Sequence, residues 1–261
     1  MTIREIMKRG PWTIGETDTL GNAQQVMTQH QIRHLPVISE GTLVGMLSER
    51  DLLSARAHAD GDERWWKIPV HFAMQPAETA DAGEPIEAVA TRMGTSRIGA
   101  LAVVDHGKLV GVVSVIDILL AHTASQKIAA ARTAAEAMTA HPPTVQPEET
   151  LVEAVRVMCE QHIHELAVVD ETGRVVGMIT EADVRRTVGD PASYLASHAP
   201  ACIDVQDVMD TGVPAVRDDR PVVEIAHYFA DARLEALPVI DERGALVGVM
   251  SYLDTLNALA R

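Results

Sequence analysis

The sequence predicts an α+β protein made of four β-α-β-β-α repeats that form two tandem modules. Three observations lead to this prediction. A seven-residue pattern occurs four times, and a methionine precedes each copy at a nearly constant distance. Between these two markers, strand-like and helix-like stretches follow one another in the same order in each copy.

The seven-residue pattern is Gly-x-x-[Ser/Thr]-x-x-Asp. It reads GMLSERD at 45–51, GVVSVID at 111–117, GMITEAD at 177–183 and GVMSYLD at 248–254. Successive glycines are 66, 66 and 71 residues apart. The preceding methionines lie 38, 37, 39 and 39 residues earlier, at Met7, Met74, Met138 and Met209. Two markers that keep register through four copies indicate an internal repeat.

Each repeat starts with a short extended stretch and a helix. The stretch is clearest in WTI at 12–14, PTV at 143–145 and PAV at 214–216, and it is poorly defined in QPAETADAGEP of the second repeat. The helix is best seen at Leu151, Val155 and Met158, whose three-to-four spacing places them on one face. Thr150 precedes this run and is suited to cap the helix.

A predicted β-hairpin and a second helix complete each repeat. The first hairpin strands are LPVI at 35–38, LAVV at 101–104, LAVV at 166–169 and LPVI at 237–240. The turns SEGT, DHGK, ETGR and ERGA each contain a glycine suited to positive φ. The second strand carries the glycine and the Ser or Thr of the pattern, and we expect that glycine to let a partner backbone or a ligand approach. The aspartate falls in the first turn of the second helix.

The repeats are predicted to occupy 1–56, 70–122, 133–188 and 204–261. Segments 57–69 and 189–203 are predicted linkers, and 123–132 is predicted to be a helical connector because it is rich in alanine. A single repeat is too small to bury its apolar residues well, so the next repeat is expected to supply the partner surface.

Composition narrows the classes of function. The 261 residues carry a net charge of −15, which argues against a nucleic-acid-binding surface. The two cysteines, Cys159 and Cys202, indicate no disulfide framework, which favours a reducing cytoplasm. The N-terminus lacks an apolar leader, and no apolar run is long enough to span a membrane. We therefore expect a soluble cytoplasmic protein.

The repeats resemble CBS domains, which are named after cystathionine beta-synthase. The resemblance rests on the IM, AM or VM start, the L-[PA]-V-[IV] strand and the closing G-x-x-[ST]-x-x-D. It implies that the repeats pair into modules and that two modules can stack into a disc-like pseudo-dimer. It also implies a regulatory sensor that binds AMP, ADP, ATP or S-adenosyl compounds and signals to a separate effector protein. Two chains could associate further, as a homodimer, through apolar outer helices.

The resemblance assigns roles to the pattern residues. An ionised aspartate can accept hydrogen bonds from both hydroxyls of a ribose, and the family places that carboxylate at Asp51, Asp117, Asp183 and Asp254. Three residues earlier, a hydroxyl and free helix N–H groups can meet a phosphate, at Ser48, Ser114, Thr180 and Ser251. The same spacing is also that of an ordinary capped helix with an acid in its first turn, so both interpretations stay open.

Basic residues distinguish the four candidate sites. The first repeat offers Arg33, His34 and Arg50 for phosphate, and the third offers His162 and His164. The second has Arg97 farther upstream, with Gly99 and Ala100 at the positions of Arg33 and His34. The fourth has Arg233, but Glu235 takes the place of Arg33. The first and third sites are therefore favoured.

An adenine ring needs an apolar slot, and the candidates for it are Ile14, Val37, Val145, Val168 and Val216. Core packing is the alternative role for all five. We expect no metal site and no catalytic residue, because no metal-ligand set or nucleophile motif accompanies the repeats. Trp65, Trp66 and Cys159 are expected to pack. A ligand-free interaction scaffold is the second hypothesis for function, and a nucleotide hydrolase is the third.

Overall fold

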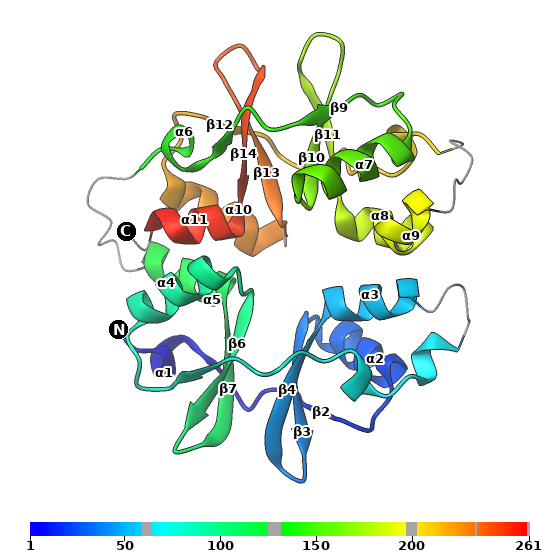
Figure 1. The fold of residues 1–261 in the computed structure, drawn as a ribbon. Helices are drawn as coiled ribbons and strands as arrows, with labels where there is room; N and C mark the ends of the chain where they lie inside the picture. Colours follow the sequence, from blue (N-terminus) through cyan, green and yellow to red (C-terminus); the bar gives the residue numbers. More distant parts are fainter. Residues whose placement is uncertain (59–63, 125–131, 197–202, 233, 260–261) are drawn as a thin grey trace. The chain divides into compact units, whose positions relative to one another are not determined.

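The structure is a computed structural model that describes residues 1–58, 64–124, 132–196, 203–232 and 234–259. The chain divides into two compact units, residues 1–118 and 119–259. The first unit holds the first two repeats up to Ile118, and the second holds the third and fourth repeats with the last part of the second. Helices combine with small mixed sheets in each unit (Figure 1). The predicted α+β class, with four repeats in two tandem modules, is confirmed.

The four repeats share one order of elements. In the first repeat the elements are β2 (Ile14–Gly15), α2 (Leu20–His30), β3 (His34–Ser39), β4 (Thr42–Ser48) and α3 (Glu49–His58). In the second they are β5 (Thr79–Asp81), α4 (Ile86–Ser96), β6 (Ala100–Asp105), β7 (Lys108–Ser114) and α5 (Val115–Ala124). In the third they are β9 (Thr144–Val145), α7 (Leu151–Gln161), β10 (Glu165–Val169), β11 (Val175–Thr180) and α8 (Glu181–Val188). In the fourth they are β12 (Val216–Arg217), α10 (Val222–Ala232), β13 (Ala236–Ile240), β14 (Leu246–Ser251) and α11 (Tyr252–Leu259).

The helix prediction for the third repeat is confirmed. Leu151, Val155 and Met158 are buried on one face of α7. Thr150 Oγ1 accepts a hydrogen bond from the backbone N–H of Glu153 at 3.3 Å, so it caps the helix. The partly buried Cys159 packs against the same core, as expected.

The first strand of the second repeat is better formed than the sequence suggests. The three residues of β5 pair in parallel with β6, whereas the corresponding strands of the other repeats have two residues each. Only Ala80 of β5 is buried, between the exposed Thr79 and Asp81. One buried small residue gives too short an apolar pattern for recognition, although the backbone still pairs.

The hairpin turns are alike within a unit and differ between the units. In the first unit, two-residue loops have positive φ at both residues, for example 49° at Glu40 and 80° at Gly41. In the second unit, Asp170 Oδ1 accepts backbone hydrogen bonds from Thr172 and Arg174 at 2.8 and 3.0 Å, and Gly173 has φ 78°. Asp241 holds the fourth hairpin in the same way. In this unit the hairpins also touch, since Arg174 forms a β-bridge with Ala245.

Each repeat is completed by a segment that comes from the other repeat of its unit. We name the stretches before and just after the four methionines lead segments: 2–9, 70–75, 133–140 and 205–210. They contain α1 (Ile3–Ile6), β1 (Lys8–Arg9), η2 (Val70–Phe72), α6 (Ala134–Ala137), β8 (Thr139–Ala140) and η3 (Val205–Asp207). β1 pairs with β7 and β8 pairs with β14, so lead segments cross to the neighbouring repeat (Figure 1). The segments at 70–75 and 205–210 cross the other way, through bridges to Met46 and Met178.

The pattern glycines lie where the lead segments cross. A β-carbon at Gly45 would lie 2.6 Å from Met74 Sδ and 3.0 Å from the carbonyl oxygen of Gln75. At Gly111 it would lie 2.8 Å from Met7 Sδ and 2.8 Å from the carbonyl oxygen of Lys8. Gly177 meets Met209 and Gly248 meets Met138 in the same manner. The two sequence markers of each repeat therefore contact each other across a pair of repeats, and the glycine admits a partner backbone as expected.

The predicted linkers contain some ordered structure. Trp65 begins η1 (Trp65–Lys67) and packs against the core of the first repeat, whereas Trp66 is 47% exposed beside Lys67. The short helix α9 (Pro191–Ala196) follows the third repeat. Most of the predicted helical connector, 125–131, lies outside the described residues, and α5 extends to Ala124 before it. No helix in the described ranges is both long and apolar enough to cross a bilayer.

We predict that Gly111→Ala destabilises the first unit by about 1–3 kcal/mol, because the new methyl group overlaps the backbone oxygen of Lys8. Chemical denaturation, followed through the tryptophans, measures the loss. Adding Met7→Ala to Gly111→Ala tests how much of the loss comes from the sulfur contact, because only the overlap with Lys8 then remains. Unchanged stability of Gly111→Ala would contradict the close approach.

Candidate functional site

The pattern aspartate and hydroxyl form a reciprocal cap in each repeat. In the first repeat, the backbone N–H and the Oγ of Ser48 donate to Asp51 Oδ2 at 2.8 and 2.5 Å, and the N–H of Asp51 donates to Ser48 Oγ at 3.2 Å. The same three bonds join Ser114 to Asp117, Thr180 to Asp183 and Ser251 to Asp254. The capping interpretation is therefore correct at all four positions, and it occupies one carboxylate oxygen of each aspartate.

The first amides of the capped helices are less available than expected. In α3, the N–H of Glu49 donates to the carbonyl oxygen of Arg33 at 2.9 Å, and the N–H of Asp51 is used by the cap. The equivalent pair of bonds is present at α5, α8 and α11. Two of the first three N–H groups thus have acceptors already, so the expectation of free helix amides is wrong for these two. The hydroxyl also donates its one proton to the aspartate, so other nearby side chains must supply the donors for any phosphate.

The second carboxylate oxygen, Oδ1, faces other donors. Gln75 Nε2 donates to Asp51 Oδ1 at 3.4 Å, and Lys8 Nζ lies 3.5 Å from Asp117 Oδ1. Both donors come from lead segments, so they belong to the other repeat of the pair. Asp183 Oδ1 instead pairs with Arg186 of its own helix. We call Oδ1 the outer oxygen, because the cap leaves it available to a second partner.

Three of the predicted phosphate ligands belong to the first repeat. His34 lies opposite Ser48 in the β3–β4 ladder, Arg33 precedes His34, and Arg50 is exposed in the first turn of α3. Burial, helped by the charge of Arg33, lowers the pKa of His34 to about 4. His34 is therefore neutral at pH 7, where it can donate a hydrogen bond but adds no positive charge.

Basic residues of the other repeats are less well placed or engaged elsewhere. Arg97 and His162 cap the C-terminal ends of α4 and α7 in the left-handed conformation, both with φ 54°, and both side chains are exposed. β10 begins only at Glu165, so His162 and His164 lie in the connection between α7 and that strand. Arg233 lies outside the described residues. Among the described side chains, no cluster of three or more His, Cys, Asp or Glu could hold a metal.

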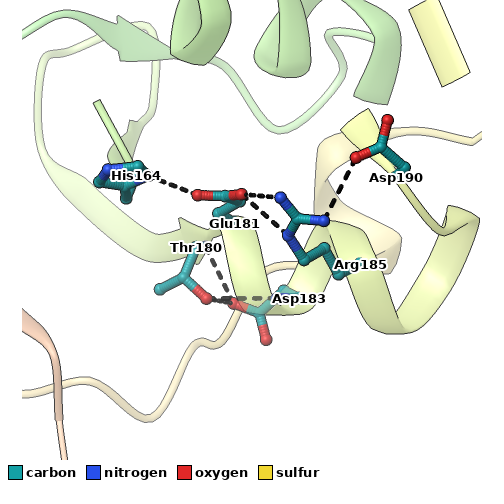
Figure 2. A network of polar contacts seen from close by, with 6 residues as sticks. All are labelled: His164, Thr180, Glu181, Asp183, Arg185 and Asp190. Carbon is teal, nitrogen blue, oxygen red and sulfur yellow. Dashed lines mark hydrogen bonds and ion pairs between the residues drawn. The ribbon is translucent and has the colours of Figure 1, made fainter. Parts of the chain in front are cut away.

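A polar network occupies the third repeat (Figure 2). His164 Nδ1 hydrogen-bonds Glu181 Oε2, and Arg185 Nε donates to Glu181 Oε1 at 2.8 Å. Arg185 Nη1 also donates to Asp190 Oδ1 at 3.3 Å, and Asp190 Oδ2 accepts from the N–H of Ser193 in α9. The network thus links the start of β10 to α8 and α9. The imidazole of His164, which was predicted to contact phosphate, is hydrogen-bonded to Glu181 instead.

The adenine candidates are core residues in the structure. Ile14 pairs with Val37 in parallel register, and Val145 pairs with Val168; these four and Val216 are at most 5% exposed. Their contact with adenine stays a prediction, and it would require apolar surface that is covered here. A shallow hollow of about 380 Å³ lies elsewhere, on α2, lined by Gly21, Gln24, Gln25, Thr28 and Gln29.

Sequence reasoning missed the residues that the lead segments bring to the aspartates. Lys8 and Gln75 each follow a methionine marker directly, but each lies against the aspartate of the other repeat. Their position after the methionine was the available signal. This position points to the aspartate of the other repeat only once it is known that the lead segments cross between repeats.

The network in the third repeat should make stability depend on acidity. The hydrogen bond with His164, followed by those with Arg185, lowers the pKa of Glu181 from 4.5 to about 2, although burial opposes the shift. Because the folded pKa is below the unfolded one, the stabilisation is complete above pH 4.5 and is lost as the pH falls toward 2.

We predict that Glu181→Gln lowers the free energy of unfolding at pH 7 by about 1–2 kcal/mol, after allowance for solvent screening. The difference from the wild type should shrink between pH 4.5 and 2, as measured by denaturation at a series of pH values. Glu153→Gln is the control, because Glu153 pairs with Arg156 on the exposed face of α7. A difference that stays constant with pH would contradict the pKa shift.

Comparison with known proteins identifies relatives along the whole chain. The CBS domain profile matches residues 3–58, 70–123, 134–190 and 205–261. Protein MJ1404 of Methanocaldococcus jannaschii is 25% identical over an alignment 269 residues long, which covers 99% of this chain and 62% of that protein. Protein MJ1225 of the same organism is 24% identical, with 95% of each chain covered.

Solved structures share the fold. The crystal structure of MJ1225 aligns with a TM-score of 0.78 at 21% identity and covers 98% of this chain and 99% of its own. A protein from Pyrococcus horikoshii aligns with a TM-score of 0.69 at 23% identity, covering 99% and 100%. The four profile matches together cover most of the sequence, and the crossed pairs of β-α-β-β-α repeats agree with them. The chain belongs to the CBS domain family.

Proposed function

We propose that the protein is a regulatory sensor that binds adenosine-containing ligands at the capped aspartates and signals to a separate effector protein. AMP, ADP, ATP and S-adenosylmethionine are the candidate ligands, and no cofactor is needed. The observation that supports this proposal most directly is the geometry of the carboxylates. Each cap fixes an ionisable aspartate through Oδ2, and in three repeats the outer oxygen already meets a hydrogen-bond donor or a cation.

Ribose hydroxyls are donors of the kind that the outer oxygen can accept. The carboxylate would take hydrogen bonds from them in place of Gln75 at Asp51, Lys8 at Asp117 and Arg186 at Asp183. Binding therefore exchanges existing contacts for new ones, and the net affinity depends on what each repeat gives up. The repeats are consequently proposed to differ in affinity, although their caps are alike.

The phosphate end of a nucleotide fits the first repeat best. Ser48 stands at the junction of β4 and α3, with Arg33 and Arg50 nearby in the sequence and the ladder. Arginine suits phosphate because its planar guanidinium can donate two parallel hydrogen bonds. In the third repeat a phosphate would compete with Glu181 for His164.

The crossed lead segments supply a route from ligand to conformation. A ligand that displaces Gln75 from Asp51 disturbs a contact between two repeats, not one within a repeat. A ligand that fits one packing of the repeats better than another shifts the population toward it. We propose that an effector protein in the cytoplasm recognises that shift. The two cysteines, which indicate no disulfide framework, support this location.

The second hypothesis is a scaffold that recruits a partner without any ligand. The caps alone favour it, because helix capping is a sufficient reason for the Ser/Thr-x-x-Asp spacing. The two hypotheses differ in what the outer oxygen does, so a change confined to that oxygen separates them.

We predict that AMP or another adenosine ligand raises the melting temperature of the protein and that Asp51→Asn with Asp183→Asn reduces this shift. Asparagine keeps an oxygen for the cap but loses the charge, so the affinity of the changed sites should fall roughly tenfold or more. Calorimetric titration with AMP, ADP, ATP and S-adenosylmethionine measures it.

Glu87→Gln is the matched control, because Glu87 is an exposed first-turn acid of α4 that lies outside the pattern. It should leave ligand binding unchanged. A folded protein that binds none of the four ligands would refute the sensor and favour the scaffold. Release of phosphate from ATP above background would instead support a hydrolase.

A further inference from the structure

One position of the lead segment faces the same place in every pair of repeats. Lys8 lies opposite Val112, Gln75 opposite Met46, Thr139 opposite Val249 and Asp210 opposite Met178. Each of these partners directly follows a pattern glycine. Because the methionine–glycine contact fixes the segment, the residue after the methionine is held at one register position near the pattern of the paired repeat.

Two of these residues reach the outer oxygen of the pattern aspartate. The distance is 3.5 Å from Lys8 Nζ to Asp117 Oδ1 and 3.4 Å from Gln75 Nε2 to Asp51 Oδ1. Lys8 comes from the first repeat and contacts the second, whereas Gln75 comes from the second repeat and contacts the first, so the geometry is observed twice in one unit. The side chain of Asp117 is 10% exposed and that of Lys8 is 76% exposed. A nearly buried carboxylate thus lies beside a largely exposed cation.

The second repeat has little positive charge of its own at this place. Gly99 and Ala100 stand where the first repeat has Arg33 and His34, and Arg97 is exposed at the end of α4. Lys8, contributed by the first repeat, therefore supplies the charge that the second repeat lacks beside its aspartate.

We propose that Lys8 is a specificity-determining residue of the second repeat's site and selects phosphorylated adenosine ligands over uncharged or sulfonium ones. This inference rests on the proposed function. When ribose hydroxyls replace the ammonium at Asp117 Oδ1, the flexible stem of Lys8 lets the ammonium turn to a phosphate. A nucleoside without phosphate displaces the ammonium and offers it no new partner. A sulfonium group beside the ammonium is repelled.

The other repeats carry different groups at this position. Gln75 is neutral, Thr139 offers a hydroxyl, and Asp210 is acidic, with its Oδ1 accepting from the N–H of Gly212 in its own turn at 2.7 Å. Only the second repeat places a cation there among the four. A preference for phosphate that depends on this position should accordingly be confined to the second repeat.

The test isolates the second repeat with Asp51→Asn, Asp183→Asn and Asp254→Asn. AMP and adenosine are then titrated into this variant with and without Lys8→Gln. We expect Lys8→Gln to weaken AMP about fivefold to tenfold and to leave adenosine unchanged or slightly tighter. Lys8→Arg should preserve most of the preference for AMP.

Arg9→Gln is the matched control. It removes the same charge from the next residue, whose Nη2 donates to the carbonyl oxygen of Arg4. It should not alter the ratio of AMP to adenosine affinity. Should the three asparagines prevent folding, Lys8→Gln and Arg9→Gln are compared in the otherwise unchanged chain, where only Lys8→Gln should weaken one class of AMP site.

Three outcomes would overturn the inference while leaving the sensor intact: equal weakening of AMP and adenosine by Lys8→Gln, an equal effect of Arg9→Gln, or no binding to the isolated second repeat by a protein that binds AMP elsewhere. If the wild type binds no adenosine ligand, the proposed function itself fails, and the inference fails with it.

Discussion

The close contact between a glycine of one repeat and a methionine of its partner governs much of this structure. Any larger residue at Gly111 would overlap both Met7 and the backbone of Lys8. The contact brings a strand edge and a foreign lead segment within a distance that only glycine permits. It therefore holds β1 in register against β7 and keeps Lys8 beside Asp117.

The same contact explains why the order of elements could be predicted from the sequence, whereas the residues around the aspartates could not. The order of strands and helices was predictable, because the spacing of apolar residues reports which face of an element is buried and turn glycines mark the hairpins. They do not report which repeat covers that face. Met7 and Met74 were recognised as markers of their own repeats, yet each packs on the pattern of the other. Lys8 and Gln75 could not be assigned to the site for that reason.

Local conformation accounts for the remaining differences. The Ser/Thr-x-x-Asp spacing indicated both a cap and a ligand site, and the cap is present in all four repeats. His162 was a candidate phosphate ligand, but it ends α7 in the left-handed conformation, which a polar residue can adopt where a helix stops. His34 was counted as a cation, but burial and the charge of Arg33 lower its pKa to about 4 and keep it neutral. Charge state depends on packing, which composition does not report.

The hairpin loops have a consequence for how this chain tolerates change. In the second unit the two loops form a bridge between Arg174 and Ala245, and the N–H of Leu246 donates to the carbonyl oxygen of Gly173 at 3.3 Å. Surface loops usually accept inserted residues at low cost. Here an insertion in one loop would also displace the other, so length changes have to occur in both repeats together. The two hairpin tips thus act as a single unit for sequence variation, although 71 residues separate their pattern glycines.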